Sequence, residues 1–190
     1  MRQEHIAAAR LLVDRDMLLE ELPKQIITCE VGVAFGGFSR RIVDIVQPRR
    51  HVMIDSWNMP GRYDHEARAE VERVFAAELA DECAMIIPTD SVAGLLLLPA
   101  NSIDFIYLDS DHSYETTRKE LLIARDKLAP GGIIAGHDYK DGVFMPGERK
   151  FHKFGVIQAV NEFMAETGFR LKYLTLEQDQ PHSFALQMEA

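Results

Sequence analysis

Apolar runs typical of buried strands alternate with amphipathic segments typical of helices, and this alternation limits the folds that the chain can adopt. The runs that predict strands cover residues 25–32, 50–55, 84–88, 102–109, 131–138, 169–176 and 183–188. The segments that predict helices cover residues 1–24, 38–47, 65–81, 114–128 and 155–167. Strand–helix–strand repeats form parallel sheets with helices on both faces. We therefore expect an α/β fold with a mostly parallel seven-stranded sheet and a C-terminal antiparallel hairpin.

Length and charge narrow the class of protein further. A chain of 190 residues, 47% of them hydrophobic, fits one globular domain over residues 1–190. With 30 acidic and 21 basic residues, the net charge of −9 argues against nucleic acid or an anionic membrane as the main partner. No apolar run approaches the roughly 20 residues of a spanning helix, and the charged N-terminal segment lacks a signal-peptide pattern. The two cysteines, Cys29 and Cys83, suit a reducing compartment, so we expect a cytoplasmic protein with a small-molecule ligand.

The turn after the first predicted strand carries glycines in a pattern suited to a bound ligand. Residues 30–39, EVGVAFGGFS, place Glu30, Gly32, Gly36 and Gly37 between this strand and the next helix. Glycines let the backbone approach a ligand closely, and the N–H groups at a helix N-terminus attract anions. The spacing does not match the G-x-G-x-x-G fingerprint of dinucleotide-binding folds. A nicotinamide-dependent oxidoreductase is therefore disfavoured.

Acidic residues also end the next two predicted strands. Asp55 and Ser56 follow the second strand, and Asp90 and Ser91 follow the third. An acidic side chain at the end of the second strand can accept both ribose hydroxyls of a nucleoside. A lone Asp at a strand end is as often a helix N-cap or part of a solvated loop. Several of them along one carboxyl edge, where open α/β sheets bind ligands, favour a binding site.

At these positions the chain resembles the class I S-adenosylmethionine-dependent methyltransferases, whose first motif is an acidic residue followed by G-x-x-x-G. The resemblance implies a Rossmann-like methyltransferase fold and S-adenosylmethionine as the cofactor. It implies that Asp55 binds the ribose and Asp90 the adenine amine. It also implies that Glu30 faces the methionine end and Ser39 the methionine carboxylate, while Trp57 either stacks on the cofactor or packs in the core. The complete set of expected cofactor contacts is Glu30, Gly32, Gly36, Gly37, Ser39, Asp55, Ser56, Trp57, Asp90, Ser91 and Asp109.

A second polar cluster is predicted at the same edge. The stretch DFIYLDSDHSYE brings Asp109, Asp111 and His112 to the end of the fourth strand, and GHD brings His137 and Asp138 to the end of the fifth. Neighbouring strands lie roughly 5 Å apart, so Asp109, His137 and Asp138 can share a divalent cation. Oxygen ligands favour Mg²⁺ or Mn²⁺, and an imidazole shifts the preference toward Mn²⁺, Fe²⁺ or Zn²⁺. Asp111 and His112 are alternative general bases, or they serve the start of the next helix.

The cluster is similar to that of metal-dependent O-methyltransferases acting on catechols and on sugars of antibiotic natural products. A small methyltransferase family shares the motifs DSDHSYE, GHDY and GVIQAVNEF, and the resemblance spans residues 26–170. It implies methyl transfer to a small-molecule hydroxyl, with Asp109, Asp111 and His112 as catalytic residues. A metal at Asp109 and Asp138 would lower the pKa of the hydroxyl. His137 stands where an Asp or Glu is usual in the sugar enzymes, so the identity of the ion stays open.

Other interpretations remain beside this one. Residues 139–154 form a long charged and aromatic insert on the ligand edge, a candidate lid. A non-catalytic nucleotide-binding module would not need the second cluster. A metal-dependent hydrolase using Asp109, Asp111 and His137 would leave the glycine turn unexplained. The [DNS]-P-P-[YFW] motif of amino methyltransferases does not follow the fourth strand. Analogy with small methyltransferases adds a homodimer as an expectation.

Overall fold

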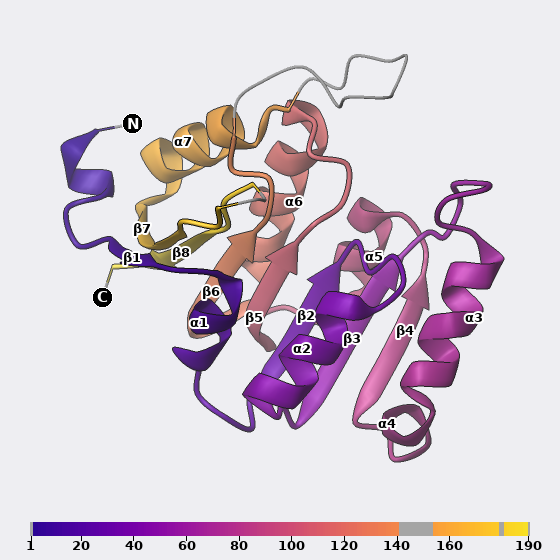
Figure 1. Cartoon of the computed structure of the whole chain (residues 1–190). Helices are drawn as coiled ribbons and strands as arrows, with labels where there is room; N and C mark the ends of the chain where they lie inside the picture. Colours follow the sequence, from indigo (N-terminus) through magenta and orange to yellow (C-terminus); the bar gives the residue numbers. More distant parts are fainter. Residues whose placement is uncertain (1, 141–153, 179–180, 190) are drawn as a thin grey trace.

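The computed structural model of the chain describes residues 2–140, 154–178 and 181–189 (Figure 1). Its strands are β1 (Arg10–Leu12), β2 (Ile27–Val31), β3 (Arg50–Asp55), β4 (Ala84–Pro88), β5 (Ile103–Leu108), β6 (Leu128–Gly136), β7 (Phe169–Thr175) and β8 (Phe184–Met188). Its helices are the 3₁₀ helix η1 (Gln3–His5) and the α-helices α1 (Arg15–Glu20), α2 (Gly37–Val46), α3 (His65–Val74), α4 (Ala76–Ala80), α5 (Ser91–Leu97), α6 (Tyr114–Lys127) and α7 (Val156–Thr167).

The strands of the described residues form one sheet in the order β1-β7-β8-β6-β5-β2-β3-β4. β8 runs antiparallel to both of its neighbours, β6 and β7, and every other pair is parallel. The expected mostly parallel sheet and the C-terminal antiparallel hairpin are confirmed. The sheet has eight strands rather than seven, because β1 adds to the edge of β7. Strands β2 to β6 all end at the same edge, where loops can gather polar side chains.

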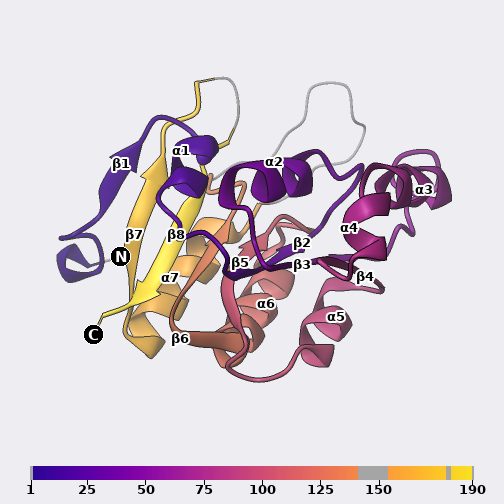
Figure 2. The same ribbon diagram turned by 90° about the horizontal axis from the view of Figure 1, so that it is seen from below.

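Helices cover both faces of this sheet. Helices α1 to α4 lie on one face and α5, α6 and α7 on the other, as the two views show (Figures 1 and 2). On the first face Phe38 and Ile42 of α2 pack with Tyr107 of β5, and on the other Leu121 of α6 packs with Ile106. Each large apolar side chain buried in this way contributes about 1.5–3 kcal/mol. None of the helices in the described part of the chain is long and apolar enough to cross a membrane.

The N-terminal segment differs from the expected helix over residues 1–24, and that prediction is wrong. The segment instead forms η1, β1 and α1 in succession. Leu12 pairs in the parallel ladder with Thr175 of β7, which holds this stretch in an extended conformation. Asp14 then accepts a hydrogen bond from the backbone N–H of Met17 at 2.9 Å, and this cap starts α1 at a new point. Strand pairing and the cap together override the helical apolar pattern.

Two further segments differ in detail from the expected elements. The helix predicted over residues 65–81 is divided at Phe75 into α3 and α4. Helix α5 was not expected from the sequence, since its apolar residues lack a polar face. Asp90 caps it by accepting a hydrogen bond from the N–H of Ala93 at 3.0 Å. The candidate lid over 139–154 lies outside the described residues, apart from its two ends.

Candidate functional site

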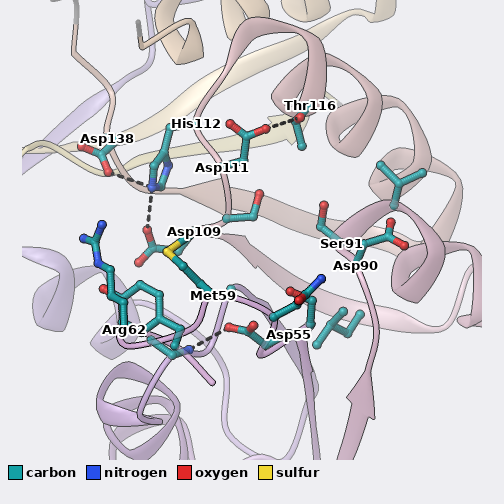
Figure 3. A pocket seen from close by; sticks show the side chains of 18 of the residues that line it. Asp55, Met59, Arg62, Asp90, Ser91, Asp109, Asp111, His112, Thr116 and Asp138 are labelled. Carbon is teal, nitrogen blue, oxygen red and sulfur yellow. Dashed lines mark hydrogen bonds and ion pairs between the residues drawn. The ribbon is translucent and has the colours of Figure 1, made fainter. Parts of the chain in front are cut away.

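A cavity of about 740 Å³ lies at the carboxyl edge of the parallel strands (Figure 3). A volume of this size is typical of small-molecule sites. The loops that follow β2, β3, β4, β5 and β6 all contribute to its lining. The predicted residues in the lining are Gly32, Asp55, Ser56, Asp90, Ser91, Asp109, Asp111, His112 and Asp138. The structure therefore brings residues of both predicted polar clusters into one pocket, while His137 is not among the residues that line it.

Gly32 is the glycine of the first turn that the fold requires. Its φ of +92° lies in the left-handed region, and a Cβ there would lie 2.0 Å from the carbonyl oxygen of Asp109. The absence of a side chain therefore lets the ends of β2 and β5 approach each other. Gly36 also has a positive φ, as the N-cap of α2, whereas a Cβ on Gly37 would meet open space. Neither Gly36 nor Gly37 lines the pocket.

Asp55 holds the glycine turn in place. Its Oδ2 accepts hydrogen bonds from the N–H groups of Val33 at 2.8 Å and Ala34 at 2.9 Å. Its Oδ1 accepts from the N–H of Trp57 at 2.8 Å. The indole of Trp57 donates to the carbonyl of Ala34, and its side chain is buried against Phe75 and other apolar residues. Of the two interpretations of Trp57, the structure supports packing, since Trp57 does not line the pocket.

Glu30 and Ser39 do not face the pocket, contrary to the expectation. Glu30 is 1% exposed and accepts a hydrogen bond from the hydroxyl of Ser39. Nε2 of His51 lies 3.0 Å from the same hydroxyl, and Nδ1 of His51 lies 2.9 Å from that of Thr28. Burial raises the pKa of Glu30 well above its usual value and lowers that of His51 to about 3. These side chains form a buried polar chain between β2, β3 and α2.

Asp90 serves two purposes at once. It is the N-cap of α5, and its exposed carboxylate also lines the pocket next to Ser91. The helix-cap explanation for this residue is therefore correct, and it leaves lone pairs of the carboxylate available to a ligand.

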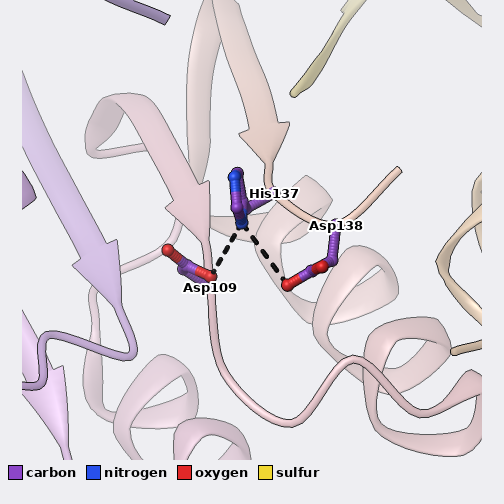
Figure 4. Close-up of side chains that lie close together, drawn as sticks. All are labelled: Asp109, His137 and Asp138. Carbon is purple, nitrogen blue, oxygen red and sulfur yellow. Dashed lines mark ion pairs between the residues drawn. The ribbon is translucent and has the colours of Figure 1, made fainter. Parts of the chain in front are cut away.

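Asp109, His137 and Asp138 lie together at the ends of β5 and β6 (Figure 4). Nδ1 of His137 is 3.6 Å from Oδ1 of Asp109 and 3.4 Å from Oδ2 of Asp138. An oxygen of Asp109, a ring nitrogen of His137 and an oxygen of Asp138 all lie within 4.8 Å of one another. Such a donor set fits a divalent cation. Nε2 of His137 is buried and has no hydrogen-bond partner among the residues that the structure describes.

The charges in this cluster act on one another. Burial raises the pKa of Asp109, while the nearby His137 and His112 oppose this rise. Burial also acts to raise the pKa of Asp138, but the hydrogen bond with His137 and the positive charges of His112 and Lys140 bring it down to about 2. Asp138 is therefore a permanent anion at neutral pH.

His112 reaches the same carboxylates from the loop after β5. Its Nε2 lies 3.2 Å from Oδ2 of Asp138 and 3.7 Å from Oδ1 of Asp109 (Figure 3). Its ring stacks on Phe154 with centroids 5.9 Å apart, and its carbonyl accepts a hydrogen bond from the N–H of Gly155. The backbone of His112 has a φ of 61°, which is uncommon for a non-glycine residue. Packing and hydrogen bonds thus hold the imidazole against the acidic cluster.

Asp111 points to the start of α6. Its Oδ2 accepts hydrogen bonds from the hydroxyls of Thr116 at 2.5 Å and Ser113 at 2.9 Å. Its Oδ1 accepts from the N–H of Ser113 at 3.1 Å. The carboxylate lines the pocket but is used in starting the helix. Of the two candidate bases, His112 is the one directed toward the cluster of Asp109, His137 and Asp138.

Comparison with protein families matches residues 29–139 to a family described as a methyltransferase domain. The match covers more than half of the 190 residues. The chain belongs to this methyltransferase family. The recognition of the chain as a methyltransferase from its motifs is thereby confirmed. No curated protein matches the chain.

Solved structures, among them those of S-adenosylmethionine-dependent methyltransferases, share the fold. A S-adenosylmethionine-dependent methyltransferase from Aquifex aeolicus has a TM-score of 0.67 at 14% identity, over 92% of this chain and 88% of that protein. The 1,6-didemethyltoxoflavin-N1-methyltransferase of Burkholderia thailandensis, solved with S-adenosylhomocysteine, has a TM-score of 0.67 at 10% identity. The match covers 92% of this chain and 76% of that protein. The pyocyanin biosynthetic protein PhzM has a TM-score of 0.67 at 14% identity over 92% of this chain, which spans 54% of PhzM. The Rossmann-like methyltransferase fold is confirmed.

The methyltransferase pocket also contains residues that the motifs did not single out. Four of them come from the loop between β3 and α3, namely Asn58, Met59, Arg62 and Tyr63. Arg62 lies over the ring of Tyr63, with its guanidinium carbon 4.9 Å from the ring centroid. The sequence does contain a signal for this loop, because NMPGRYD is a polar stretch with Pro and Gly directly after the strand end that carries Asp55.

Proposed function

We propose that the chain transfers a methyl group from S-adenosylmethionine to a hydroxyl group of a small-molecule acceptor. The observation that carries the proposal is the contact of His112 with Asp138, in the same pocket as Asp55 and Asp90. A protein that only binds a nucleotide has no need of an imidazole held between carboxylates. The family match and the fold shared with S-adenosylmethionine-dependent methyltransferases support the reaction type.

The cofactor would occupy the part of the pocket next to β2, β3 and β4. Oδ1 of Asp55 accepts one backbone hydrogen bond, from Trp57, and a carboxylate oxygen has two lone pairs, so it can also accept from a ribose hydroxyl. Asp90 and Ser91 would accept from the adenine amine. S-adenosylmethionine, when bound there, supplies an electrophilic methyl group on a sulfonium, and the carboxylates along this edge favour such a cation.

His112 would act as the general base. The proton of the acceptor hydroxyl passes to Nδ1 of His112, since Nε2 donates its own proton to Asp138, while the acceptor oxygen forms its bond to the methyl carbon and the carbon–sulfur bond breaks. The products are the methyl ether and S-adenosylhomocysteine. Asp138, with its low pKa, stabilises the imidazolium that forms. Because the displacement is in line, positioning of the hydroxyl near Asp109 matters as much as the base itself.

Asp109, His137 and Asp138 would hold a divalent cation in this proposal. Their donor atoms and spacing fit Mg²⁺ or Mn²⁺, and the imidazole of His137 favours Mn²⁺. A cation bound here would supply Lewis acidity, which lowers the pKa of a bound hydroxyl. Titration calorimetry of the chelator-treated protein with Mn²⁺ tests the site, with His137→Ala as the variant that should lose binding. Undiminished Mn²⁺ binding in that variant would contradict this ligand set.

Binding and turnover test the function itself. We expect saturable binding of S-adenosylhomocysteine in calorimetry, and transfer of a labelled methyl group to at least one member of a panel of small hydroxylated compounds. The same panel should include aliphatic and aromatic amines, since a label found only in amines would overturn the hydroxyl assignment. Absence of S-adenosylhomocysteine binding at millimolar ligand would overturn the cofactor. The His112→Gln variant distinguishes enzymatic transfer from background reaction.

A further inference from the structure

Glu120 is a buried carboxylate beneath the wall of the pocket. It lies in α6 and is 1% exposed. Its Oε1 accepts a hydrogen bond from the hydroxyl of Ser110 at 2.5 Å. Ser110 follows β5 and lines the pocket, as does Ser91, which begins α5 after β4 and acts on the same carboxylate. The carboxylate is thus bonded to one of the loops that form the pocket.

Packing alone does not account for a carboxylate at this place. The other buried residues of α6 are Thr117, Leu121 and Ala124, which form an inward stripe at helical spacing with Glu120. Burying a carboxylate costs free energy unless it is paired and hydrogen-bonded. No ion pair joins Glu120 to any cation of the described residues, and its hydrogen bond goes to Ser110 of the pocket wall. An apolar side chain at this position would avoid the cost of burial but would release Ser110.

We infer that Glu120 is a positioning residue that sets the direction of the hydrogen bonds along this wall of the pocket. By accepting from Ser110 it directs that hydroxyl proton away from the pocket, so that oxygen lone pairs of Ser110 face the ligand. The wall then accepts hydrogen bonds from donor groups such as an amine or a ribose hydroxyl. The inference rests on the cofactor placement proposed above.

Protonation of Glu120 would reverse part of this arrangement. Burial raises the pKa of Glu120 to about 7, with a smaller contribution from the charge of Asp111, while the hydroxyls of Ser110 and Ser91 act to lower it. When the proton lies on Oε1, the carboxyl group donates a hydrogen bond to Ser110 instead of accepting one, and Ser110 then turns its own proton toward the pocket. A hydrogen-bond donor of the ligand then loses its acceptor in this wall. Asp111, from the loop after β5, is the charged group that acts on Glu120 here.

The affinity for S-adenosylhomocysteine as a function of pH tests this inference. In calorimetry between pH 5.5 and 8.5, the wild-type affinity should fall as the pH drops through 7, by about fivefold, the value of one hydrogen bond. Glu120→Gln keeps the shape of the side chain but always presents a donor. The dissociation constant of this variant for S-adenosylhomocysteine should stay near the low-pH value of the wild type at every pH. The ratio of the variant constant to the wild-type constant should therefore change with pH. Thr117→Val, on the same buried stripe, is the matched control and should keep the wild-type profile even if its melting temperature falls.

Ser110→Ala provides a second, independent readout. The substitution removes the hydroxyl through which Glu120 acts on the ligand, so the affinity should lose its change near pH 7. A purely structural Glu120 would leave the wild-type profile unchanged in this variant. This variant also decides the matter if Glu120→Gln fails to fold.

The outcomes separate the inference from the proposed function. Identical profiles for wild type and Glu120→Gln, or a wild-type profile in Ser110→Ala, would overturn the role of Glu120. Unchanged binding in Asp55→Ala would instead overturn the cofactor placement. Since Asp55 and Glu120 lie on different elements and share no contact in the described structure, the two failures are distinguishable.

Discussion

Nε2 of His112 lies 3.2 Å from Oδ2 of Asp138, and this contact joins the loop after β5 to the loop after β6. Both residues have positive φ angles, of 61° and 53°, in a region that non-glycine residues seldom adopt. Such conformations cost roughly 1–3 kcal/mol each and persist where the surroundings hold them. Here the neighbouring strands and the stacked ring of Phe154 hold the pair. The arrangement is that of an imidazole oriented by a permanent anion.

His112→Gln should therefore lower the rate of methyl transfer by about 100-fold or more, the range of a lost general base. Glutamine fills a similar volume and lies outside the proposed cofactor part of the pocket, so the affinity for S-adenosylhomocysteine should stay within about threefold. A labelled-methyl assay and calorimetry measure the two quantities. His65→Gln, at the exposed start of α3, is the matched control. Wild-type turnover in His112→Gln would remove this residue from the proposed chemistry.

Asp55→Ala should weaken S-adenosylhomocysteine binding and also destabilise the fold. The substitution leaves the N–H groups of Val33, Ala34 and Trp57 without their acceptor, at about 1 kcal/mol each. Urea unfolding and calorimetry measure the two effects.

Asp104→Ala is the control for that variant. Asp104 also accepts a backbone hydrogen bond, from Ile27 at 2.8 Å, but at the opposite end of β5. Loss of this hydrogen bond should lower the free energy of unfolding without changing the affinity for S-adenosylhomocysteine. Equal losses of affinity in the Asp55 and Asp104 variants would mean that Asp55 acts through stability alone.

The sequence was sufficient to predict which strand ends share an edge, because parallel strands joined by crossover helices must all end on one side. Asp109, His137 and Asp138 were predicted together for this reason, and the structure brings them together. It was not sufficient to predict the direction of each side chain. Glu30 lies on β2 facing α2, and Ser39 lies on the buried side of α2, so the two bond to each other.

Contacts between segments that are distant in the sequence could not be predicted from a local pattern either. Residues 10–12 became a strand because β7 offers a free edge, a fact that appears only once the sheet is assembled. Glu120 is a partial exception. An acidic residue on the stripe formed with Thr117, Leu121 and Ala124 can be recognised from helical periodicity alone, although its hydrogen-bond partner Ser110 cannot.

Gly32 and Gly37, two of the three glycines of the first turn, should respond differently to alanine. Gly32→Ala places a methyl group 2.0 Å from a carbonyl oxygen at a positive φ, so we expect a loss of at least about 3 kcal/mol in the free energy of unfolding and loss of ligand binding. Gly37→Ala meets open space at the first turn of α2 and should gain about 0.5–1 kcal/mol. Urea unfolding measures both. A tolerated Gly32→Ala would contradict the close approach of β2 and β5.

His51 should make the stability of the fold depend on pH. Its pKa is about 3 in the folded chain, because burial disfavours the charged form, against 6.5 when unfolded. Below pH 6.5 the imidazole of His51 binds a proton in the unfolded state but not in the native state. The contribution of His51 to stability is therefore fully present above pH 6.5 and is lost as the pH falls toward 3. The slope can reach about 1.4 kcal/mol per pH unit.

The variant His51→Gln isolates this effect. Glu30, whose pKa is raised by burial, acts with the opposite sign between pH 4.5 and its own pKa. Comparison of wild type and variant at each pH removes that contribution to first order. Urea unfolding from pH 4.5 to 8 should show that the advantage of the wild type over His51→Gln shrinks steadily below pH 6.5. Parallel curves over this window would mean that His51 takes up its proton in the folded state, and that the polar chain with Ser39 and Glu30 opens to water.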